Sequence, residues 1–250
     1  MKALISDVHS NLEALQAVLA DIARHSVEAI YCLGDVVGYG PNPRECLDLI
    51  MRHCPVVLMG NHDQAVLFDP MNFNPVAERA TMWTRDQLDK PFPSRSAADA
   101  RWEFLAERPL KHRESDFLYV HGSPRNPLNE YIFPEDIYSE AKMRSIFAQV
   151  PRYMFQGHTH VPGIFTESLE FFSPDELESG EYHLDGGKTL CNVGSVGQPR
   201  DSDWHACYVL LDGQTIRYRR VEYDIDTTIR KIRDIDELDD FLGDRLRGGR

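Results

Sequence analysis

The chain has 250 residues, 42% of them hydrophobic and 27% charged, which is ordinary usage for a globular domain and excludes a disordered or collagen-like chain. Its net charge of −13 argues against a nucleic-acid polymer as a partner, because phosphate contacts dominate non-specific binding to such polymers. Apolar runs such as Val56–Met59 and Ala206–Leu211 are too short to cross a bilayer, and acidic Asp7 comes before a signal peptide could form. We therefore expect a soluble, cytoplasmic protein without a membrane partner.

The first 63 residues alternate between strand and helix signals. Three apolar segments are predicted to be strands: Lys2–Ser6, Ala29–Leu33 and Pro55–Met59. Apolar spacing predicts a helix over Leu12–Ile22, with Ser10 as its N-cap and Glu13 reaching back to it, and a second helix after Pro41. Short loops between such elements imply right-handed crossovers, so these strands are expected to form a parallel sheet covered by helices.

Residues 64–115 lose this alternation. Prolines separate two predicted helices, Val76–Leu88 and Ser96–Ala106, and further strands follow them. We therefore interpret the segment as a helical cap inserted into a single domain of residues 1–246, with a frayed tail at residues 247–250. Long insertions at the mouth of a sheet commonly form lids or binding loops, so this cap is expected to cover the site and select the substrate.

The second half of the chain is richer in strands. Six are predicted: Phe117–Val120, Tyr153–Gln156, Val161–Thr166, Lys188–Val193, His205–Leu211 and Thr215–Tyr223. Asp212-Gly213 predicts a hairpin turn between the last two strands, and helical patterns are expected in Pro134–Val150 and Ile225–Leu246. The five cysteines are odd in number and irregularly spaced, which favours buried apolar roles over disulfides or a zinc site.

Metal-binding residue types follow five of the predicted strands. The motifs are Asp7-Val8-His9, Gly34-Asp35, Gly60-Asn61-His62-Asp63, His121-Gly122 and Gly157-His158-Thr159-His160. Since ligands gather beyond the carboxyl ends of strands in α/β sheets, these loops should converge. Carboxylates, a carboxamide and imidazoles together suit paired Mn, Fe, Zn or Ni ions. Any one motif could be structural, with Asp35 capping a turn or His121 in the core, but their joint occurrence favours a metal site.

This ordered set of motifs resembles the calcineurin-like metallophosphoesterase superfamily. Three further segments resemble its small prokaryotic phosphodiesterase-like members: Gly34–Pro41, Val120–Pro124 and Asn192–Arg200. The resemblance covers nearly the whole chain. It implies an α/β fold in which two mixed sheets flanked by helices form a four-layer α/β/β/α sandwich, with the metal site at one edge of the sheets.

The resemblance also implies a role for each matching residue. Two divalent transition-metal ions would be held by seven residues: Asp7, His9 and His160 on the first, Asn61, His121 and His158 on the second, and Asp35 as the bridge. A hydroxide shared by the ions would attack phosphorus in line with the leaving oxygen, and His62 would protonate that oxygen as the general acid. Asp63 could orient His62 or hold a turn, and both interpretations stay open.

The leading hypothesis is therefore a dinuclear-metal-dependent phosphoesterase that hydrolyses a small phosphodiester or phosphomonoester. A protein phosphatase or a nucleoside-polyphosphate phosphatase is an alternative, because the same core would serve either substrate. The other class is a non-enzymatic binding scaffold of the same fold, as in the retromer subunit. In such scaffolds the ligand set typically decays, whereas here it is complete, so the enzyme is favoured. The sequence leaves the oligomeric state open.

Overall fold

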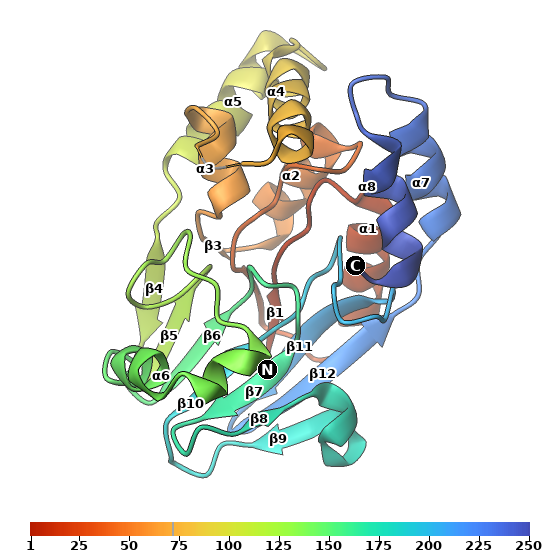
Figure 1. Cartoon of the computed structure of the whole chain (residues 1–250). Helices are drawn as coiled ribbons and strands as arrows, with labels where there is room; N and C mark the ends of the chain where they lie inside the picture. Colours follow the sequence, from red (N-terminus) through yellow and green to blue (C-terminus); the bar gives the residue numbers. More distant parts are fainter. Residues whose placement is uncertain (72) are drawn as a thin grey trace.

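The computed structural model describes residues 1–71 and 73–250, which contain two mixed six-stranded sheets (Figure 1). The first sheet has the order β3-β2-β1-β11-β12-β9: β3 (Val56–Val57), β2 (Ala29–Cys32), β1 (Lys2–Ile5), β11 (Ala206–Asp212), β12 (Thr215–Val221) and β9 (Glu181–His183). The second has the order β4-β5-β6-β10-β7-β8: β4 (Lys111–Glu114), β5 (Phe117–Val120), β6 (Tyr153–Gln156), β10 (Thr189–Asn192), β7 (Gly163–Thr166) and β8 (Phe171–Phe172).

Helices flank the two sheets on their outer sides, and those of residues 61–106 gather at one end of the sheets (Figure 1). In the described residues they are α1 (Leu12–Ile22), α2 (Pro43–His53), α3 (Asn61–Leu67), α4 (Pro75–Asp89), α5 (Arg95–Ala106), α6 (Glu140–Phe147), α7 (Ile225–Arg233) and α8 (Asp240–Asp244). Short 3₁₀ turns are η1 (Pro134–Tyr138), η2 (Pro174–Glu176), η3 (Glu178–Gly180) and η4 (Arg245–Gly248). The predicted boundaries of α1, α4 and α5 hold to within one residue at each end.

Separate apolar layers hold this architecture together. Side chains alternate along β1, so Ala3 and Ile5 pack with the helices of the first sheet, while Leu4 packs between the sheets with Phe155. A further cluster joins the outer face of the second sheet to α6 through residues such as Ile146. Helix, sheet, sheet and helix therefore form four layers, which confirms the predicted α/β/β/α sandwich.

The structure differs from the prediction at the N-termini of two helices, α1 and α3. Asn11, not Ser10, is the N-cap of α1, because its Oδ1 accepts from the amide of Ala14 at 3.1 Å. The Gly60–Asp63 motif was expected to be a loop, but α3 begins at Asn61. Asp63 stabilises that start, since its carboxylate accepts from the amides of Gly60 and Val37, each at 3.1 Å. These contacts support the turn interpretation of Asp63.

Several other boundaries also needed correction. Lys111–Glu114, expected in the helical cap, is strand β4 and pairs with β5, while β8 and β9 were not predicted at all. The pattern over Ile225–Leu246 is divided into α7, α8 and η4, because Asp239 starts a new helix by accepting from the amide of Phe241 at 3.0 Å. Residues 247–250 were expected to fray, yet Gly249 accepts a hydrogen bond from the amide of Ser202 at 3.0 Å.

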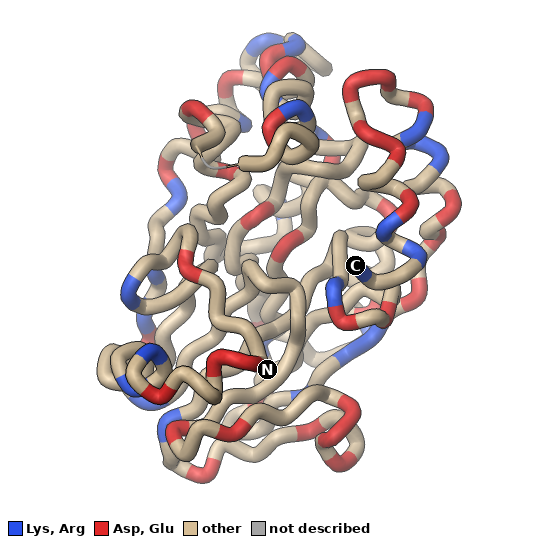
Figure 2. Tube along the Cα trace, viewed as in Figure 1, with Lys and Arg blue, Asp and Glu red and all other residues tan. Residues whose placement is uncertain are grey.

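Charged residues lie mainly on helices and outer loops, and much of the sheet region is uncharged (Figure 2). All five cysteines are buried and free in the described part of the chain, as expected. The helices described there include none that combines the length and apolar character needed to span a membrane.

Candidate metal centre

The five strand-end loops bring their polar side chains together. Strands β1, β2 and β3 run parallel in the first sheet, and β5 runs parallel to β6 in the second. Within 4.8 Å of one another lie the possible ligand atoms of three buried groups: Asp7, His9 and His160; His9, Asp35 and His62; and Asp35, His121 and His158. Asn61 joins them through its 3.1 Å approach to His121. All the residues predicted to bind metal are therefore clustered.

The first half-site consists of Asp7, His9 and His160. Its carboxylate oxygen and its two Nε2 atoms face one another. The Nδ1–H groups of His9 and His160 donate to the carbonyl oxygens of Val37 at 3.2 Å and Gln198 at 2.6 Å. Burial lowers the pKa of both imidazoles, so each neutral ring keeps its proton on Nδ1 and leaves Nε2 as an acceptor. The two Nε2 atoms are 3.2 Å apart, and that of His160 is 3.3 Å from Asp7 Oδ1. A cation between these acceptors would relieve their repulsion.

The second half-site consists of Asn61, His121 and His158. The Nδ1–H group of His121 donates to the carbonyl of Leu33 at 3.0 Å, so its Nε2 faces Asn61 Oδ1 at 3.1 Å and Asp35 Oδ2 at 3.4 Å. Burial lowers the pKa of His121, but the charge of Asp35 and the hydrogen bond to it outweigh burial and raise the pKa to about 9. Positive charge is therefore favoured at this point, whether a proton or a metal ion carries it.

His158 is held differently from the other imidazoles. Its buried Nε2 has no hydrogen-bond partner among the described residues. Its ring stacks on Tyr131, with centroids 3.9 Å apart and planes 19° apart, and meets His121 edge-on at 4.7 Å. Burial lowers the pKa of His158 to about 3, so the ring is neutral. An unpartnered buried nitrogen beside two other candidate ligands fits coordination to a metal.

Asp35 lies between the two half-sites. Its Oδ2 is 3.6 Å from Nε2 of His9 and 3.4 Å from Nε2 of His121, while its Oδ1 accepts from the amide of His62 at 2.8 Å. Burial alone would raise the pKa of this carboxyl, but the neighbouring imidazoles, His121 foremost, hold it well below its usual range. The group is therefore a carboxylate within reach of both half-sites.

The backbone of these loops contains several non-glycine residues with positive φ angles, a strained conformation. Of the eleven described non-glycine residues with positive φ, five are candidate ligands: Asp7, His9, Asp35, His158 and His160. Such left-handed conformations cost free energy and persist only where the surroundings impose them. The neighbouring glycines allow close approach, since a Cβ at Gly60 would overlap Asp35 and one at Gly157 would overlap Asp7.

His62 lies beside both half-sites in an aromatic setting. Its ring centroid is 4.8 Å from that of His9, 4.4 Å from that of Tyr39 and 4.6 Å from that of Phe73. Burial lowers its pKa to about 4, and its buried Nδ1 has no hydrogen-bond partner in the described residues. The isolated protein therefore holds this imidazole in its neutral form at neutral pH.

A cleft of about 830 Å³ opens beside the second half-site. Its walls combine Asn61 and His158 with aromatic, amide and other side chains: Gln64, Ala65, Phe68, Asp69, Met71, Phe73, Asn126, Asn129 and Tyr131. Six residues of the expected cap therefore reach the cleft, all between positions 64 and 73, whereas the described parts of α4 and α5 contribute no wall residue. Arg125, a possible anion contact by sequence, is paired with Glu130 instead.

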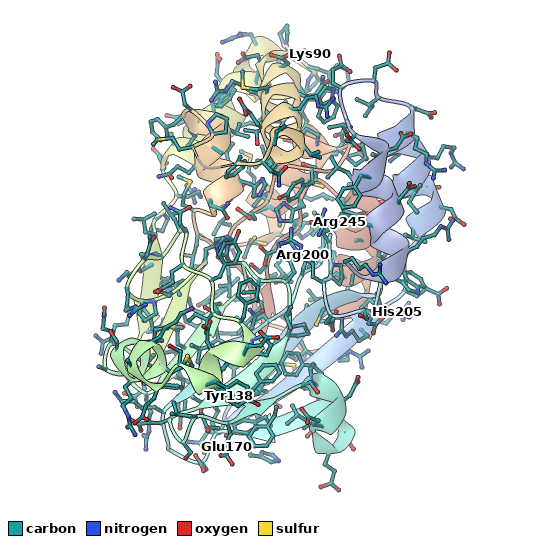
Figure 3. All side chains as sticks on the ribbon, in the orientation of Figure 1. Lys90, Tyr138, Glu170, Arg200, His205 and Arg245 are labelled. Carbon is teal, nitrogen blue, oxygen red and sulfur yellow. The ribbon has the colours of Figure 1, made fainter. Side chains whose placement is uncertain are left out.

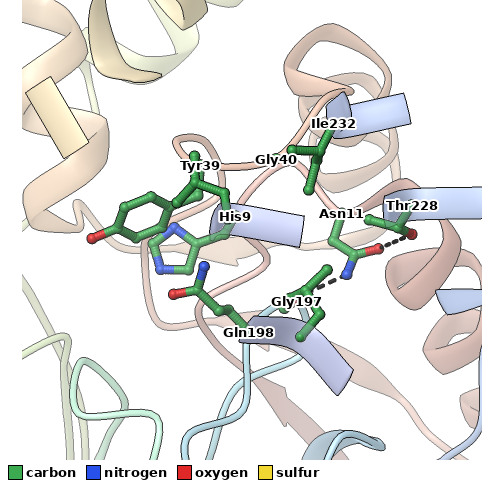
Figure 4. A pocket seen from close by; sticks show the side chains of 10 residues that line it. His9, Asn11, Tyr39, Gly40, Gly197, Gln198, Thr228 and Ile232 are labelled. Carbon is green, nitrogen blue, oxygen red and sulfur yellow. Dashed lines mark hydrogen bonds between the residues drawn. The ribbon is translucent and has the colours of Figure 1, made fainter. Parts of the chain in front are cut away.

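A second hollow lies behind His9 and is only about 10 Å³ in volume, too small for a substrate (Figure 4). Asn11 crosses it, donating to the carbonyl of Gly197 at 2.9 Å and accepting from the hydroxyl of Thr228 at 3.1 Å. Asn11 thus joins α1, the 192–200 loop and α7 and takes no part in the ligand cluster.

Three residues near the cluster had no role assigned from sequence alone: Tyr39, Tyr131 and Arg200. Tyr39 packs against His9 and His62, and Tyr131 against His158. Tyr39 and Arg200 fall inside the segments that carry the family resemblance, which was a usable signal. Nothing local marks Tyr131, because its partner lies 27 residues further along the chain.

The fold and the cluster together define a protein with paired sheets and a buried His/Asp/Asn centre of the kind that binds divalent metals. Residues 1–215 match the calcineurin-like phosphoesterase superfamily domain, and the chain belongs to that superfamily. This confirms the resemblance seen in the strand-end motifs.

Related proteins agree with this assignment. An uncharacterized protein of Methanocaldococcus jannaschii is 36% identical over 263 residues, covering 100% of this chain and 98% of its own. The crystal structure of a metallophosphoesterase from Sphaerobacter thermophilus is also 36% identical, with a TM-score of 0.84 and coverage of 100% and 98%. A hypothetical protein from Pyrococcus horikoshii, 21% identical, shares the fold with a TM-score of 0.77 and coverage of 100% and 99%.

Proposed function

We propose that this protein is a metal-dependent phosphoesterase that hydrolyses a small phosphate ester. The observation that carries the proposal is the convergence of possible ligand atoms. Nε2 of His9 lies 3.2 Å from Nε2 of His160, and Nε2 of His121 lies 3.1 Å from Asn61 Oδ1 and 3.4 Å from Asp35 Oδ2. Asp7, His9 and His160 would hold one divalent ion, Asn61, His121 and His158 a second, and Asp35 would serve both.

Two divalent ions held at such a centre would polarise the phosphoryl oxygens and lower the pKa of a bound water. The chain's own residues contribute the geometry. The carbonyls of Val37, Leu33 and Gln198 accept from Nδ1 of three imidazoles and so orient the rings with Nε2 facing the centre. This arrangement needs little reorganisation when a substrate binds, which lowers the cost of reaching the transition state.

His62 would hold and then donate the proton that the leaving oxygen needs. The imidazole is neutral in the isolated protein because burial lowers its pKa to about 4. A bound phosphate would add negative charge close to the ring and raise that pKa, so protonation would be coupled to substrate binding. His62 also forms a ligand-like group with His9 and Asp35, and direct coordination is the competing role for it.

The leaving group would occupy the 830 Å³ cleft beside Asn61 and His158. Its aromatic walls and amide side chains suit a small organic group better than a flat protein surface. This favours a small ester over a phosphoprotein. We propose residues 64–71 and 73, rather than the whole of 64–115, as the part of the cap that selects the substrate, because six of them line the cleft.

The direct experiment combines elemental analysis of the purified protein with hydrolysis of bis-p-nitrophenyl phosphate and p-nitrophenyl phosphate. We expect about two transition-metal equivalents, with manganese among the effective ions, and measurable cleavage of the diester. Cleavage of the monoester alone would shift the assignment to a phosphatase. Bound metal with no turnover of either compound would contradict the proposal and favour a binding scaffold.

A further inference from the structure

The 830 Å³ cleft lies where the leaving group of a substrate would be released. Phe73 lines this cleft, and its ring centroid is 4.6 Å from that of His62, the proposed proton donor. Asn61 and His158, candidate ligands of the second half-site, line it as well. A leaving oxygen that takes its proton from His62 would therefore place the remainder of its group in the cleft.

Both segments that wall the cleft expose apolar side chains. Phe68 and Met71 are 64% and 78% exposed, and Tyr131 in the other segment is 41% exposed. Tyr131 also stacks on Phe133, with ring centroids 5.4 Å apart and planes 7° apart. Exposed apolar surface beside a polar centre marks a place where a ligand is buried, and an aromatic ligand gains further from stacking on aromatic side chains.

Hydrogen bonds to the backbone hold both walls in place. The guanidinium of Arg85 in α4 donates to the carbonyl of Val66 at 2.9 Å and to that of Phe68. In the other segment, Oδ1 of Asn126 accepts from the amide of Asn129 at 3.1 Å. Because the walls are formed before a ligand arrives, little conformational entropy is lost when it binds. The shape and chemistry of the cleft therefore indicate the kind of group that it takes.

Most of the polar wall residues carry amide side chains, namely Gln64, Asn126 and Asn129. Since Oδ1 of Asn126 already accepts within its own loop, its NH₂ group is the part that can donate to a ligand. Amide groups supply both donors and acceptors, so they suit the polar edge of a planar ring that lies between apolar side chains.

The charge of the cleft disfavours an anionic leaving group. Asp69 is the one described wall residue with a formal charge at neutral pH, and the described wall includes no lysine or arginine. The arginines closest in sequence to site residues are engaged elsewhere, since Arg125 pairs with Glu130 and Arg200, labelled in Figure 3, donates to Gln198 at 2.7 Å. A second anionic group would therefore meet a carboxylate and no cation in this cleft.

We propose that the leaving group of the substrate contains a planar aromatic ring without negative charge, which packs among Phe68, Phe73 and Tyr131 and meets the amide side chains at its edge. This inference rests on the proposed phosphoesterase function. It assigns the substrate class as phosphate esters of alcohols that bear an uncharged aromatic ring. It excludes nucleoside polyphosphates cleaved at an anhydride bond, whose leaving group would bring further phosphates into a cleft without cations.

The test uses phosphonates in which a methylene group replaces the ester oxygen, so that they bind without being hydrolysed. Benzylphosphonate supplies a planar ring, cyclohexylmethylphosphonate a ring that is not planar, and ethylphosphonate no ring. Calorimetric titration of the manganese-loaded protein should show benzylphosphonate binding at least about tenfold more tightly than ethylphosphonate and about threefold more tightly than cyclohexylmethylphosphonate. Elemental analysis after each titration verifies that the metal stays bound.

Two further compounds of nearly the same shape test the effect of charge. The protein should bind 4-carbamoylbenzylphosphonate about tenfold more tightly than 4-carboxybenzylphosphonate, because Asp69 repels the added carboxylate. Asp69→Asn should remove most of this difference.

Substitutions of Phe68 test the ring contact. Phe68→Ala should reduce the preference for benzylphosphonate over ethylphosphonate several-fold, whereas Phe68→Leu should keep most of it but lose the preference over cyclohexylmethylphosphonate. The matched control is Phe241→Ala, because Phe241 is 55% exposed and is not among the described wall residues. This control should leave every preference unchanged.

Three results would overturn the inference: equal binding of benzylphosphonate and ethylphosphonate, a preference that Phe68→Ala leaves intact, or binding of the carboxylate compound as tight as that of the carbamoyl compound. If turnover of bis-p-nitrophenyl phosphate accompanies such a result, the phosphoesterase proposal stands and only the assignment of the leaving group fails. The expected preferences without turnover of any ester would reject the phosphoesterase proposal while supporting a cleft for uncharged aromatic groups.

Discussion

The two half-sites are built from similar residues but are held in different ways. In the first, backbone carbonyls fix both imidazoles, and the hollow behind His9 has a volume of only about 10 Å³. In the second, His121 is fixed in the same way, but His158 is held by the stack with Tyr131, which is 41% exposed. The second half-site also opens on the large cleft.

The first half-site is therefore rigid, whereas the imidazole of His158 in the second can adjust its direction. Hydrogen bonds to main-chain carbonyls set both the tautomer and the direction of a ligand, whereas a ring stack limits direction less strictly. We therefore expect the first half-site to bind metal more tightly. The second should respond to whatever occupies the cleft, because Tyr131 and His158 both line it.

The largest effect should come from the residue that the half-sites share. Asp35→Asn should abolish activity and sharply reduce metal occupancy at both positions, because an amide cannot supply two charged oxygens to two cations. The measurement is elemental analysis together with turnover. His160→Ala provides the comparison, since it should weaken the first metal more than the second. Normal turnover of Asp35→Asn with two metal equivalents would make Asp35 a structural residue only.

A smaller loss is expected when the proton donor is removed. His62→Asn should reduce hydrolysis of an alkyl ester by ~10²–10⁴-fold and that of a nitrophenyl ester much less, because nitrophenolate leaves without a proton. Both metals should remain bound, as the half-sites do not need His62. An equal loss for the two esters would exclude the acid role, and loss of metal would show that His62 is a ligand or a support for one.

The stack on His158 offers a way to change one half-site alone. Tyr131→Ala should weaken the second metal about tenfold and leave the first unchanged, as found when residues that orient metal ligands are removed. Tyr131→Phe keeps the ring and should restore nearly normal affinity. Calorimetric titration with Mn²⁺ measures both sites. If the alanine variant binds the second metal normally, the stack does not position His158.

The smallest effect on the metal centre is expected from a partly buried ion pair outside it. Asp21 accepts from Tyr208 at 2.8 Å and from Arg219 at 3.1 Å. Burial alone would raise the pKa of Asp21, but the contacts with Tyr208 and Arg219 outweigh burial, so the pKa is lowered. The stability that the ionised Asp21 contributes is therefore complete above about pH 4 and is lost as the pH falls further. Asp21→Asn should cost about 1–3 kcal/mol at pH 7 and less at pH 3.

Metal binding and turnover of Asp21→Asn should be unchanged where the variant is folded. Thermal unfolding at both pH values measures the loss of stability, and calorimetry with Mn²⁺ checks the metal centre. A stability difference that stays constant down to pH 3 would mean that Asp21 does not titrate with a lowered pKa.

Local sequence signals predicted a helix-covered sheet and the convergence of the strand-end motifs, because each depends on short-range patterns, whereas the four layers were predicted from the family resemblance. The alternation of Ala3, Leu4 and Ile5 marks a strand with two buried faces, and the metal-binding residues directly follow such strands. The strands β8 and β9 have two and three residues and depend on pairing with distant partners, so no local period marks them. The Tyr131–His158 stack likewise arises only when remote loops meet.

The most direct test of two unequal half-sites that share Asp35 is anomalous scattering from crystals grown at increasing Mn²⁺ concentration. The account predicts that a peak among Asp7, His9 and His160 fills first. A second peak should follow among Asn61, His121 and His158, with the carboxylate of Asp35 between the two. A single peak at all concentrations, simultaneous filling of both positions, or coordination by His62 in place of Asp35 would contradict it.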